Sequence, residues 1–160
     1  FGYEDEGVTP DVITIAKGIG GGLPLGAMIA IGKSAELFTP GSHGSTFGGN
    51  PISCAAANVV LEEIERSNLL RKNAEKGALL RKKLAIIPGV VEARGKGLLL
   101  GIEVEEHLAK TIARELQQAG YLVNGANEDV IRIAPSYLVT EAQLIKFVKA
   151  FERICRKHYG

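Results

Sequence analysis

The sequence has 160 residues, of which 46% are apolar and 23% charged, as is usual for a globular protein with one or two modest cores. Its net charge of +1 gives no electrostatic argument for binding nucleic acid or an anionic membrane, and no apolar run has the length of a membrane span. Cys54 and Cys155 both lie in apolar stretches, which indicates reduced thiols in a cytoplasmic protein. No cluster of potential ligands has the spacing of a metal site.

The first predicted element is a strand that ends at a lysine. Val12, Ile13 and Ile15 form a β-branched apolar run that is typical of a buried strand, and Lys17 follows closely. In the glycine cluster of residues 18–22 we expect no helix to begin, because glycine loses more backbone entropy than other residues. A lysine held there against apolar walls would lose hydration and become nucleophilic, as a Schiff-base lysine requires. The ordinary alternative is a solvated surface lysine.

The same glycines permit a second interpretation, a nucleotide-binding loop. Gly18-Ile19-Gly20 partly matches the dinucleotide fingerprint, which requires a helix directly after the loop. The apolar residues 27–31 favour a strand at that place instead. A helix that starts right after Gly22 would support a nucleotide-binding module, and a strand over residues 27–31 would exclude it.

A second motif, SHGSTFGGNP over residues 42–51, precedes a predicted helix. Ser45 and Thr46 offer hydroxyl groups, and the glycines around them leave backbone N–H groups accessible, a combination that suits a phosphate. Asn50 is the predicted N-cap of the helix, which extends from Pro51 to Arg66. Its expected apolar stripe consists of Ile52, Ala55, Ala56, Val59, Val60 and Ile64.

The second half of the chain predicts an α+β domain with a mainly antiparallel sheet. Ser67 is the predicted cap of a helix that ends near Leu84, and its expected inner face is formed by Leu69, Leu70, Leu80 and Leu84. Strands are expected over 90–93, 98–104, 121–124 and 130–134, with a turn over 94–97 and a helix over 107–119. A last helix starts at Thr140, with Gln143 as its capping-box partner.

Arg132 is the third candidate residue. It alternates with Ile131 and Ile133, so its side chain is expected on the opposite face of the strand. An arginine on a rigid strand can bind a carboxylate bidentately with little entropy left to lose. The alternative is a structural ion pair within the chain.

Together these motifs resemble the class III aminotransferases of fold type I, which use pyridoxal phosphate. The matching stretches are PDVITIAKGIGGGLPLGA, HGSTFGGNP, RGKGLLLGIEV and VIRIAPSYLVT, and HGSTFGGNP is most similar to the acetylornithine and ornithine aminotransferase branch. The resemblance implies that Lys17 binds the cofactor covalently and acts as the catalytic base and acid. It implies that Thr46 binds the cofactor phosphate of the neighbouring subunit, that Ser45 lines the substrate site, and that Arg132 binds the substrate α-carboxylate.

The resemblance also implies the fold class and the domains. We expect an α/β protein that is the C-terminal portion of a fold-type I enzyme. Residues 1–66 would be the end of the large cofactor-binding domain, and residues 67–160 the small α+β domain. The family's glycine-threonine phosphate loop, its ring-stacking aromatic residue and its aspartate at the pyridine nitrogen would lie upstream of Phe1. The chain alone is therefore expected to be a poor catalyst or none.

The expected activity is the transfer of an ω-amino group from N-acetylornithine to 2-oxoglutarate, in arginine biosynthesis, by a homodimer with a shared active site. Ornithine, succinylornithine and 4-aminobutyrate are alternative donors. Two hypotheses of other classes stay open at this point, namely a nucleotide-binding module and a non-catalytic relative or fragment.

Overall fold

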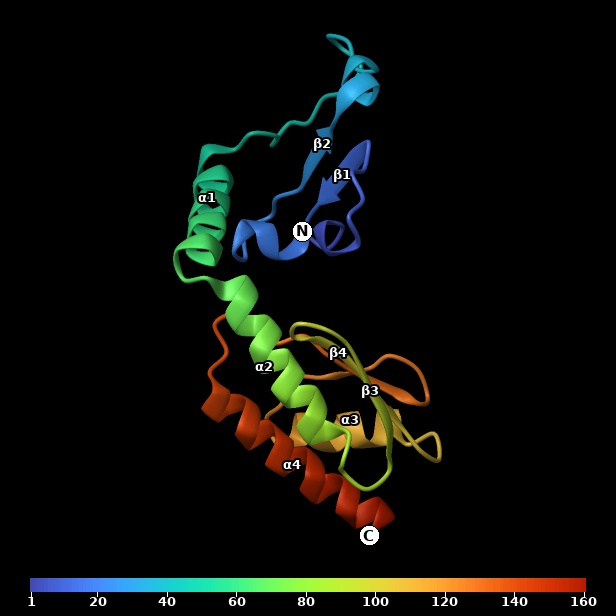
Figure 1. The fold of residues 1–160 in the computed structure, drawn as a ribbon. Coiled ribbons are helices and arrows are strands. Elements are labelled where there is room, and N and C mark those ends of the chain that lie inside the picture. Colours follow the sequence, from blue (N-terminus) through green and yellow to red (C-terminus); the bar gives the residue numbers. More distant parts are fainter. The chain divides into compact units, whose positions relative to one another are not determined.

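The computed structural model describes all 160 residues, which divide into two compact units (Figure 1). The N-terminal unit is Phe1–Ser67 and the C-terminal unit is Asn68–Gly160. Both contain helices and antiparallel sheets, in agreement with the expected α/β class. Neither contains a helix that is both long enough and apolar enough to cross a membrane.

The N-terminal unit contains a two-stranded antiparallel ribbon formed by β1 (Val12–Ile15) and β2 (Ala27–Ala30). The ribbon continues by one hydrogen bond, in which the Ile31 N–H donates to the Asp11 carbonyl at 2.8 Å. The strand over residues 12–15 is confirmed, but its burial is not, since its side chains are exposed or half-buried. A buried strand needs cover on both faces, whereas β1 has one partner strand and only its Ile13 and Ile15 face is partly covered within this chain.

Three short 3-10 helices interrupt this unit, η1 (Glu4–Glu6), η2 (Lys17–Gly20) and η3 (Gly32–Glu36). No helix begins in the glycine cluster of residues 18–22, as expected, although η2 begins at Lys17 and extends into the cluster as far as Gly20. No helix begins after Gly22, and β2 occupies the residues that the nucleotide-binding hypothesis needed as a helix. That hypothesis is wrong.

Helix α1 (Pro51–Arg66) begins and ends where the sequence predicts. Its N-cap is confirmed, since the Asn50 Oδ1 accepts hydrogen bonds from the Ile52 N–H at 3.0 Å and the Ser53 N–H at 3.2 Å. The predicted apolar stripe is only partly right. The buried residues of α1 are Ser53 and Ala57, whereas Ile52 and Val59 are 70% and 63% exposed.

The C-terminal unit is built on a four-stranded sheet with the order β3-β4-β6-β5, antiparallel throughout. The strands are β3 (Val90–Lys96), β4 (Leu99–Val104), β5 (Asn124–Gly125) and β6 (Val130–Ile133). The β3–β4 register runs on to Lys96 and Leu99, so the turn lies at residues 97–98 and not over 94–97 as expected. Of the expected strand over 121–124, only Asn124 lies in a strand, as the first residue of β5.

The helices of this unit are α2 (Leu69–Leu84), α3 (Ala109–Gln118) and α4 (Glu141–Tyr159). The capping box of α4 is confirmed, because the Gln143 N–H donates to the Thr140 hydroxyl and the Thr140 N–H donates to the Gln143 side chain. The predicted cap of α2 is wrong. Asn68 is the N-cap, in a left-handed conformation, and the Ser67 hydroxyl instead donates to Glu63 of the preceding helix.

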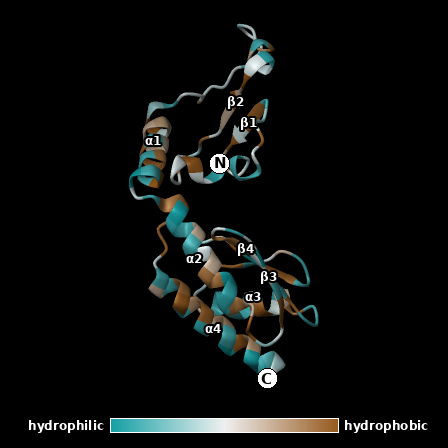
Figure 2. Cartoon of the chain, in the orientation of Figure 1, coloured by the Kyte–Doolittle hydropathy of each residue, from teal (hydrophilic) through white to brown (hydrophobic).

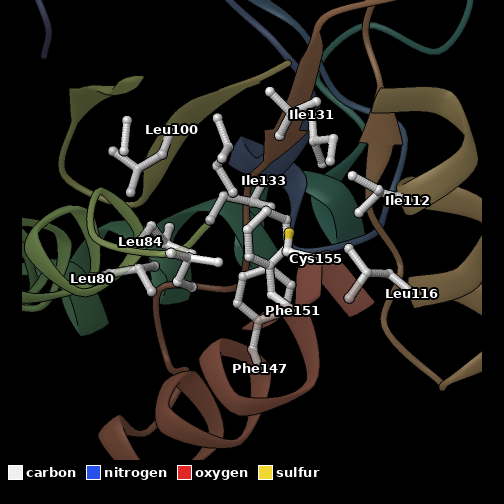
Figure 3. Close-up of a cluster of buried hydrophobic side chains, with 14 of the residues drawn as sticks. Leu80, Leu84, Leu100, Ile112, Leu116, Ile131, Ile133, Phe147, Phe151 and Cys155 are labelled. Atoms are coloured by element: carbon white, nitrogen blue, oxygen red, sulfur yellow. The ribbon is translucent and has the colours of Figure 1, made fainter. Parts of the chain in front are cut away.

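A continuous core fills the space between the helices and one face of the sheet (Figure 3). Its residues come from all three helices and from the sheet, and Figure 3 labels Leu80, Leu84, Leu100, Ile112, Leu116, Ile131, Ile133, Phe147, Phe151 and Cys155. Leu70, expected on the inner face of α2, is 63% exposed. At Gly77 a Cβ would lie 1.8 Å from the Gly97 carbonyl oxygen, so α2 packs against the β3–β4 turn at a distance that only glycine permits.

Candidate active site

Lys17 lies where β1 gives way to η2, and its backbone conformation is unusual. Its φ of 60° lies in the left-handed region, which costs a non-glycine residue about 1–2 kcal/mol. Residues held in this region are concentrated at functional sites. The side chain of Lys17 is exposed and makes no hydrogen bond or ion pair within the chain, so its amine is free for a ligand. The sequence predicts this residue but not its left-handed backbone.

The glycines beside Lys17 leave open space. A Cβ added at Gly18 or Gly22 would have no neighbour within 4 Å, whereas one at Gly20 or Gly21 would press on Leu25 at 3.3 Å or Val60 at 3.1 Å. Packing within this chain therefore does not require glycine at position 18, whereas Gly22 has a φ of 109°, which favours glycine whatever the space around it. A free amine beside unfilled backbone positions fits a cofactor that is bound at the amine and lies close to the main chain.

Ser45 and Thr46 lie next to each other in the exposed loop that leads into α1. The loop turns back on itself through the Gly48 N–H, which donates to the Ser45 carbonyl at 3.3 Å, and the Asn50 N–H, which donates to the Phe47 carbonyl at 3.2 Å. Neither hydroxyl makes a hydrogen bond within the chain, so both are available to an anion. The structure joins neither of them to Lys17 by a hydrogen bond, and their phosphate and substrate roles stay predictions.

Arg132 occupies the centre of β6 and the exposed face of the sheet, while Ile131 and Ile133 are buried on the opposite face. The predicted alternation is confirmed. Arg132 has no ion pair or hydrogen bond within the chain, so the alternative of a structural ion pair is not found. Its buried neighbours fix the strand, which leaves the guanidinium free on a rigid support.

Arg132 belongs to a row of residues across the exposed face of the sheet. The register pairs Arg94 of β3 with Gly101 of β4, Gly101 with Arg132 of β6, and Arg132 with Asn124 of β5. Residues directly opposite each other on antiparallel strands share a face, so these four form one line. The sequence predicts a turn over residues 94–97, which includes Arg94, and therefore does not predict this row.

Arg94 is held by two carboxylates. Its Nη1 donates to the Glu92 Oε2 at 3.0 Å and also to the Glu103 Oε2. The hydrogen bond to Glu103, followed by that to Glu92, raises the pKa of Arg94 above its ordinary value. The two glutamates face each other directly across β3 and β4.

The other shifted groups serve the fold. Burial raises the pKa of the Cys155 thiol to about 12, in keeping with a thiol that is fully enclosed in the core. Burial also raises the pKa of Tyr159 to about 12, and its hydroxyl donates to the Glu105 carbonyl at 2.7 Å. No group of three or more acidic, histidine or cysteine side chains could hold a metal ion.

Comparisons with known proteins give a consistent family assignment. The family model described as Aminotransferase class-III matches residues 1–155. The acetylornithine aminotransferase of Mycobacterium tuberculosis is 48% identical over 162 residues, which is 100% of this chain and 40% of that protein. The acetylornithine aminotransferase of Bacillus subtilis is 44% identical over 161 residues, which is 99% of this chain and 42% of that protein. The chain thus spans about two-fifths of the length of these relatives.

Comparisons with solved structures agree with this family assignment. An acetylornithine aminotransferase from Elizabethkingia anophelis superposes with a TM-score of 0.85 at 32% identity, over 97% of this chain and 41% of that one. An ornithine aminotransferase from Plasmodium yoelii gives a TM-score of 0.87 at 27% identity, over 97% and 43% of the two chains.

Proposed function

Since this chain belongs to the class III aminotransferase family, we propose that the protein transfers the ω-amino group of N-acetylornithine to 2-oxoglutarate with pyridoxal phosphate as cofactor. The donor is proposed from the relatives that are 44–48% identical, which are acetylornithine aminotransferases. The acceptor and a role in arginine biosynthesis are proposed because the resemblance to this family implies them. Ornithine is the second candidate donor, because a solved relative with a TM-score of 0.87 is named an ornithine aminotransferase.

The observation that carries the proposal is the free amine of Lys17 on a left-handed backbone beside Gly18. The packing of this chain requires neither the strain at Lys17 nor a glycine at position 18. A cofactor bound through the Lys17 Nζ gives both a purpose. Its phosphate would be held by the Thr46 hydroxyl and the backbone N–H groups of the same loop, supplied by a neighbouring subunit.

The residues of this chain have separate tasks in the reaction. Bound pyridoxal phosphate withdraws electrons from the carbon that carries the amino group, which makes the proton on that carbon acidic. The Nζ of Lys17 takes this proton and later returns it, as general base and then as general acid. Arg132 holds the α-carboxylate through its planar guanidinium and thereby orients the substrate, and Ser45 lines the substrate site.

A homodimer is part of the proposal, since Thr46 and Lys17 would serve cofactors in different subunits. Chain mixing tests it. A Lys17→Ala subunit mixed with a Thr46→Ala subunit should regain activity, because half of the sites in the mixed dimer then contain both residues.

The cofactor assignment is tested with the complete polypeptide that its gene encodes. The protein is incubated with pyridoxal phosphate, reduced with borohydride, digested and examined by mass spectrometry. We expect the adduct on Lys17 and a loss of activity in Lys17→Ala on the order of 10²–10⁴-fold or more. Lys33→Ala, which removes another exposed lysine of the same unit, is the matched control and should keep the adduct.

An adduct scattered over surface lysines, or none, would refute the cofactor assignment. Given the adduct, a panel of N-acetylornithine, ornithine, succinylornithine and 4-aminobutyrate decides the donor by comparison of kcat/KM. A preference for any of the last three would overturn the choice of N-acetylornithine while leaving the aminotransferase chemistry in place.

A further inference from the structure

The left-handed backbone of Lys17 needs support from the structure on both of its sides. A non-glycine residue keeps such a conformation only where its surroundings determine it. On the N-terminal side, Ile15 of β1 is paired with Ala27 of β2, two residues before Lys17. On the C-terminal side Lys17 is the first residue of the 3-10 helix η2. Support on this second side therefore has to come through η2.

Hydrogen bonds make η2 and the residues directly after it a short, stiff turn. The Gly21 N–H donates to the Gly18 carbonyl at 3.1 Å, and the Leu23 N–H donates to the Gly20 carbonyl at 3.0 Å. Each hydrogen bond of this kind fixes the backbone dihedrals of the residues that it encloses. A displacement at the C-terminal end of the turn is therefore passed on to Lys17 at its N-terminal end.

The C-terminal end of η2 packs against one face of α1 (Figure 1). The buried residues of the N-terminal unit are Gly20 on η2 and Ser53 and Ala57 on α1, and the last two lie one helical turn apart. Val60 continues the same face of α1, and its Cγ2 lies 3.1 Å from the place that a Cβ of Gly21 would occupy. The Val60 side chain thus packs directly against the backbone of Gly21.

We propose that Val60 is a positioning residue, which holds η2 through Gly21 and thereby keeps Lys17 in its left-handed conformation. The inference rests on the proposed function, in which the Lys17 Nζ is the base and the acid of the reaction. Proton transfer by a single amine depends on its distance and direction from the reacting carbon, and a small displacement lowers the rate strongly. Val60 acts on this amine through the backbone and makes no contact with the substrate.

Truncation of Val60 should release the turn and let Lys17 leave its left-handed conformation. The ordinary preference of a non-glycine residue against this conformation corresponds to a factor of about 5–30 in population. We therefore expect Val60→Ala to lower kcat by up to about 5–30-fold, because fewer molecules hold the amine in place. The KM for the amino donor should stay nearly unchanged, since no contact with the donor is removed.

A second effect of the truncation needs neither cofactor nor substrate. A released turn should open the hydrogen bonds of the Gly21 and Leu23 N–H groups more often, so that both exchange faster with deuterium. The Ile31 N–H, which donates to the Asp11 carbonyl at the end of the β1–β2 ribbon, should exchange as in the wild type. Exchange in the cofactor-free protein thus measures the support of the turn separately from activity.

The experiment compares Val60→Ala and Val60→Thr with the wild type in the complete polypeptide. Val60→Thr keeps the β-branched shape and should lie close to the wild type. Val59→Ala is the matched control, because it truncates the adjacent valine of the same helix, which is exposed in this chain. Deuterium exchange is followed by mass spectrometry on the cofactor-free proteins. Values of kcat are expressed per bound cofactor, so that a loss of folded protein cannot imitate a loss of rate.

We expect Val60→Ala alone to speed exchange in the turn and to lower kcat at constant KM. Unchanged exchange of the Gly21 and Leu23 amides in Val60→Ala would overturn the inference. Equally fast exchange in Val59→Ala would also overturn it, because the effect would then be a general loosening of α1.

The two layers of the proposal fail in different ways. If exchange follows the expected pattern but kcat per bound cofactor stays at the wild-type value, Val60 supports the turn and its role in positioning Lys17 is wrong. If the wild-type protein has no aminotransferase activity while exchange follows the pattern, it is the proposed function that fails. A fall in kcat per bound cofactor at constant KM, restored in Val60→Thr, is the readout that a merely structural role of Val60 would not produce.

Discussion

The two units of the chain bury their apolar residues to very different degrees. The buried residues of the N-terminal unit are Gly20, Ser53 and Ala57, whereas eighteen buried residues form one cluster in the C-terminal unit. Apolar stretches are nevertheless visible on β1, β2 and α1 (Figure 2), and Met28, Ile29 and Phe47 are 50%, 42% and 83% exposed. The helices and strands of the N-terminal unit are therefore determined by local sequence signals, whereas those of the C-terminal unit are also stabilised by a shared hydrophobic core.

This difference separates the candidate site residues by how firmly the chain itself holds them. Arg132 lies on a strand whose neighbours, Ile131 and Ile133, are buried in the core, so its position is preorganised by this chain alone. Lys17, Ser45 and Thr46 lie in the unit without a core. We therefore expect the position of Arg132 to tolerate separation of the two units better than that of Lys17.

The largest expected effect comes from that separation. A segment of residues 68–160 should unfold cooperatively in urea, because its core is complete within the segment. A segment of residues 1–67 should show no cooperative transition, since too little apolar area is buried to offset the loss of conformational entropy. Far-UV circular dichroism during urea titration measures both. A cooperative transition in residues 1–67 would contradict the comparison.

Two phenylalanines, one in each unit, test the same contrast at the level of a side chain. Phe151 is fully buried in the core beside Phe147, with ring centroids 6.0 Å apart, and Phe47 is 83% exposed. Phe151→Ala should lower the free energy of unfolding by about 3–5 kcal/mol, because it removes buried surface and leaves a cavity. Phe47→Ala should change it by less than about 0.5 kcal/mol.

Urea unfolding of the 160-residue chain measures the free energy of unfolding of both variants, from the transition of the C-terminal unit. Equal losses in the two variants would contradict the exposed position of the Phe47 side chain. A loss below about 1 kcal/mol in Phe151→Ala would mean that the core around α4 is less tightly packed than the burial indicates.

Structural features that depend only on neighbouring residues were predicted correctly from the sequence. The N-cap Asn50 and the capping box of Thr140 and Gln143 are local patterns, and the structure has both. The outward direction of Arg132 follows from alternation along one strand. These features need no knowledge of distant parts of the chain.

Features that depend on distant residues or on backbone angles were missed. Periodicity placed Ile52 and Val59 on the inner face of α1, but a helix with apolar residues on several sides does not reveal which side is covered. The left-handed backbone of Lys17 could not be predicted, because glycine adopts this conformation more easily than lysine and the sequence has lysine at this position. The pairing of Arg94 with Glu103 depends on the β3–β4 register, which extends three residues beyond the expected strand end at residue 93.

The smallest expected effect concerns one ion pair that ties distant elements of the C-terminal unit together. Glu115 of α3 accepts hydrogen bonds from the Lys157 Nζ at 3.0 Å, and its Oε1 lies 2.9 Å from the His158 Nε2 of α4. The hydrogen bond from Lys157 is the main cause that lowers the pKa of Glu115 below its ordinary value of 4.5. A carboxyl whose pKa is lower in the folded state stabilises the fold fully above pH 4.5, and this contribution is lost as the pH falls through the folded pKa.

Glu115→Gln should therefore lower the free energy of unfolding by about 0.2–1 kcal/mol at pH 7, as measured by urea unfolding, and this loss should shrink toward zero as the pH drops below 4.5. Lys157→Gln should weaken the same pH dependence, because it removes the main cause of the shift. A cost of Glu115→Gln that is constant with pH would instead assign its effect to packing between α3 and α4, and the core alone would then account for the stability of this unit.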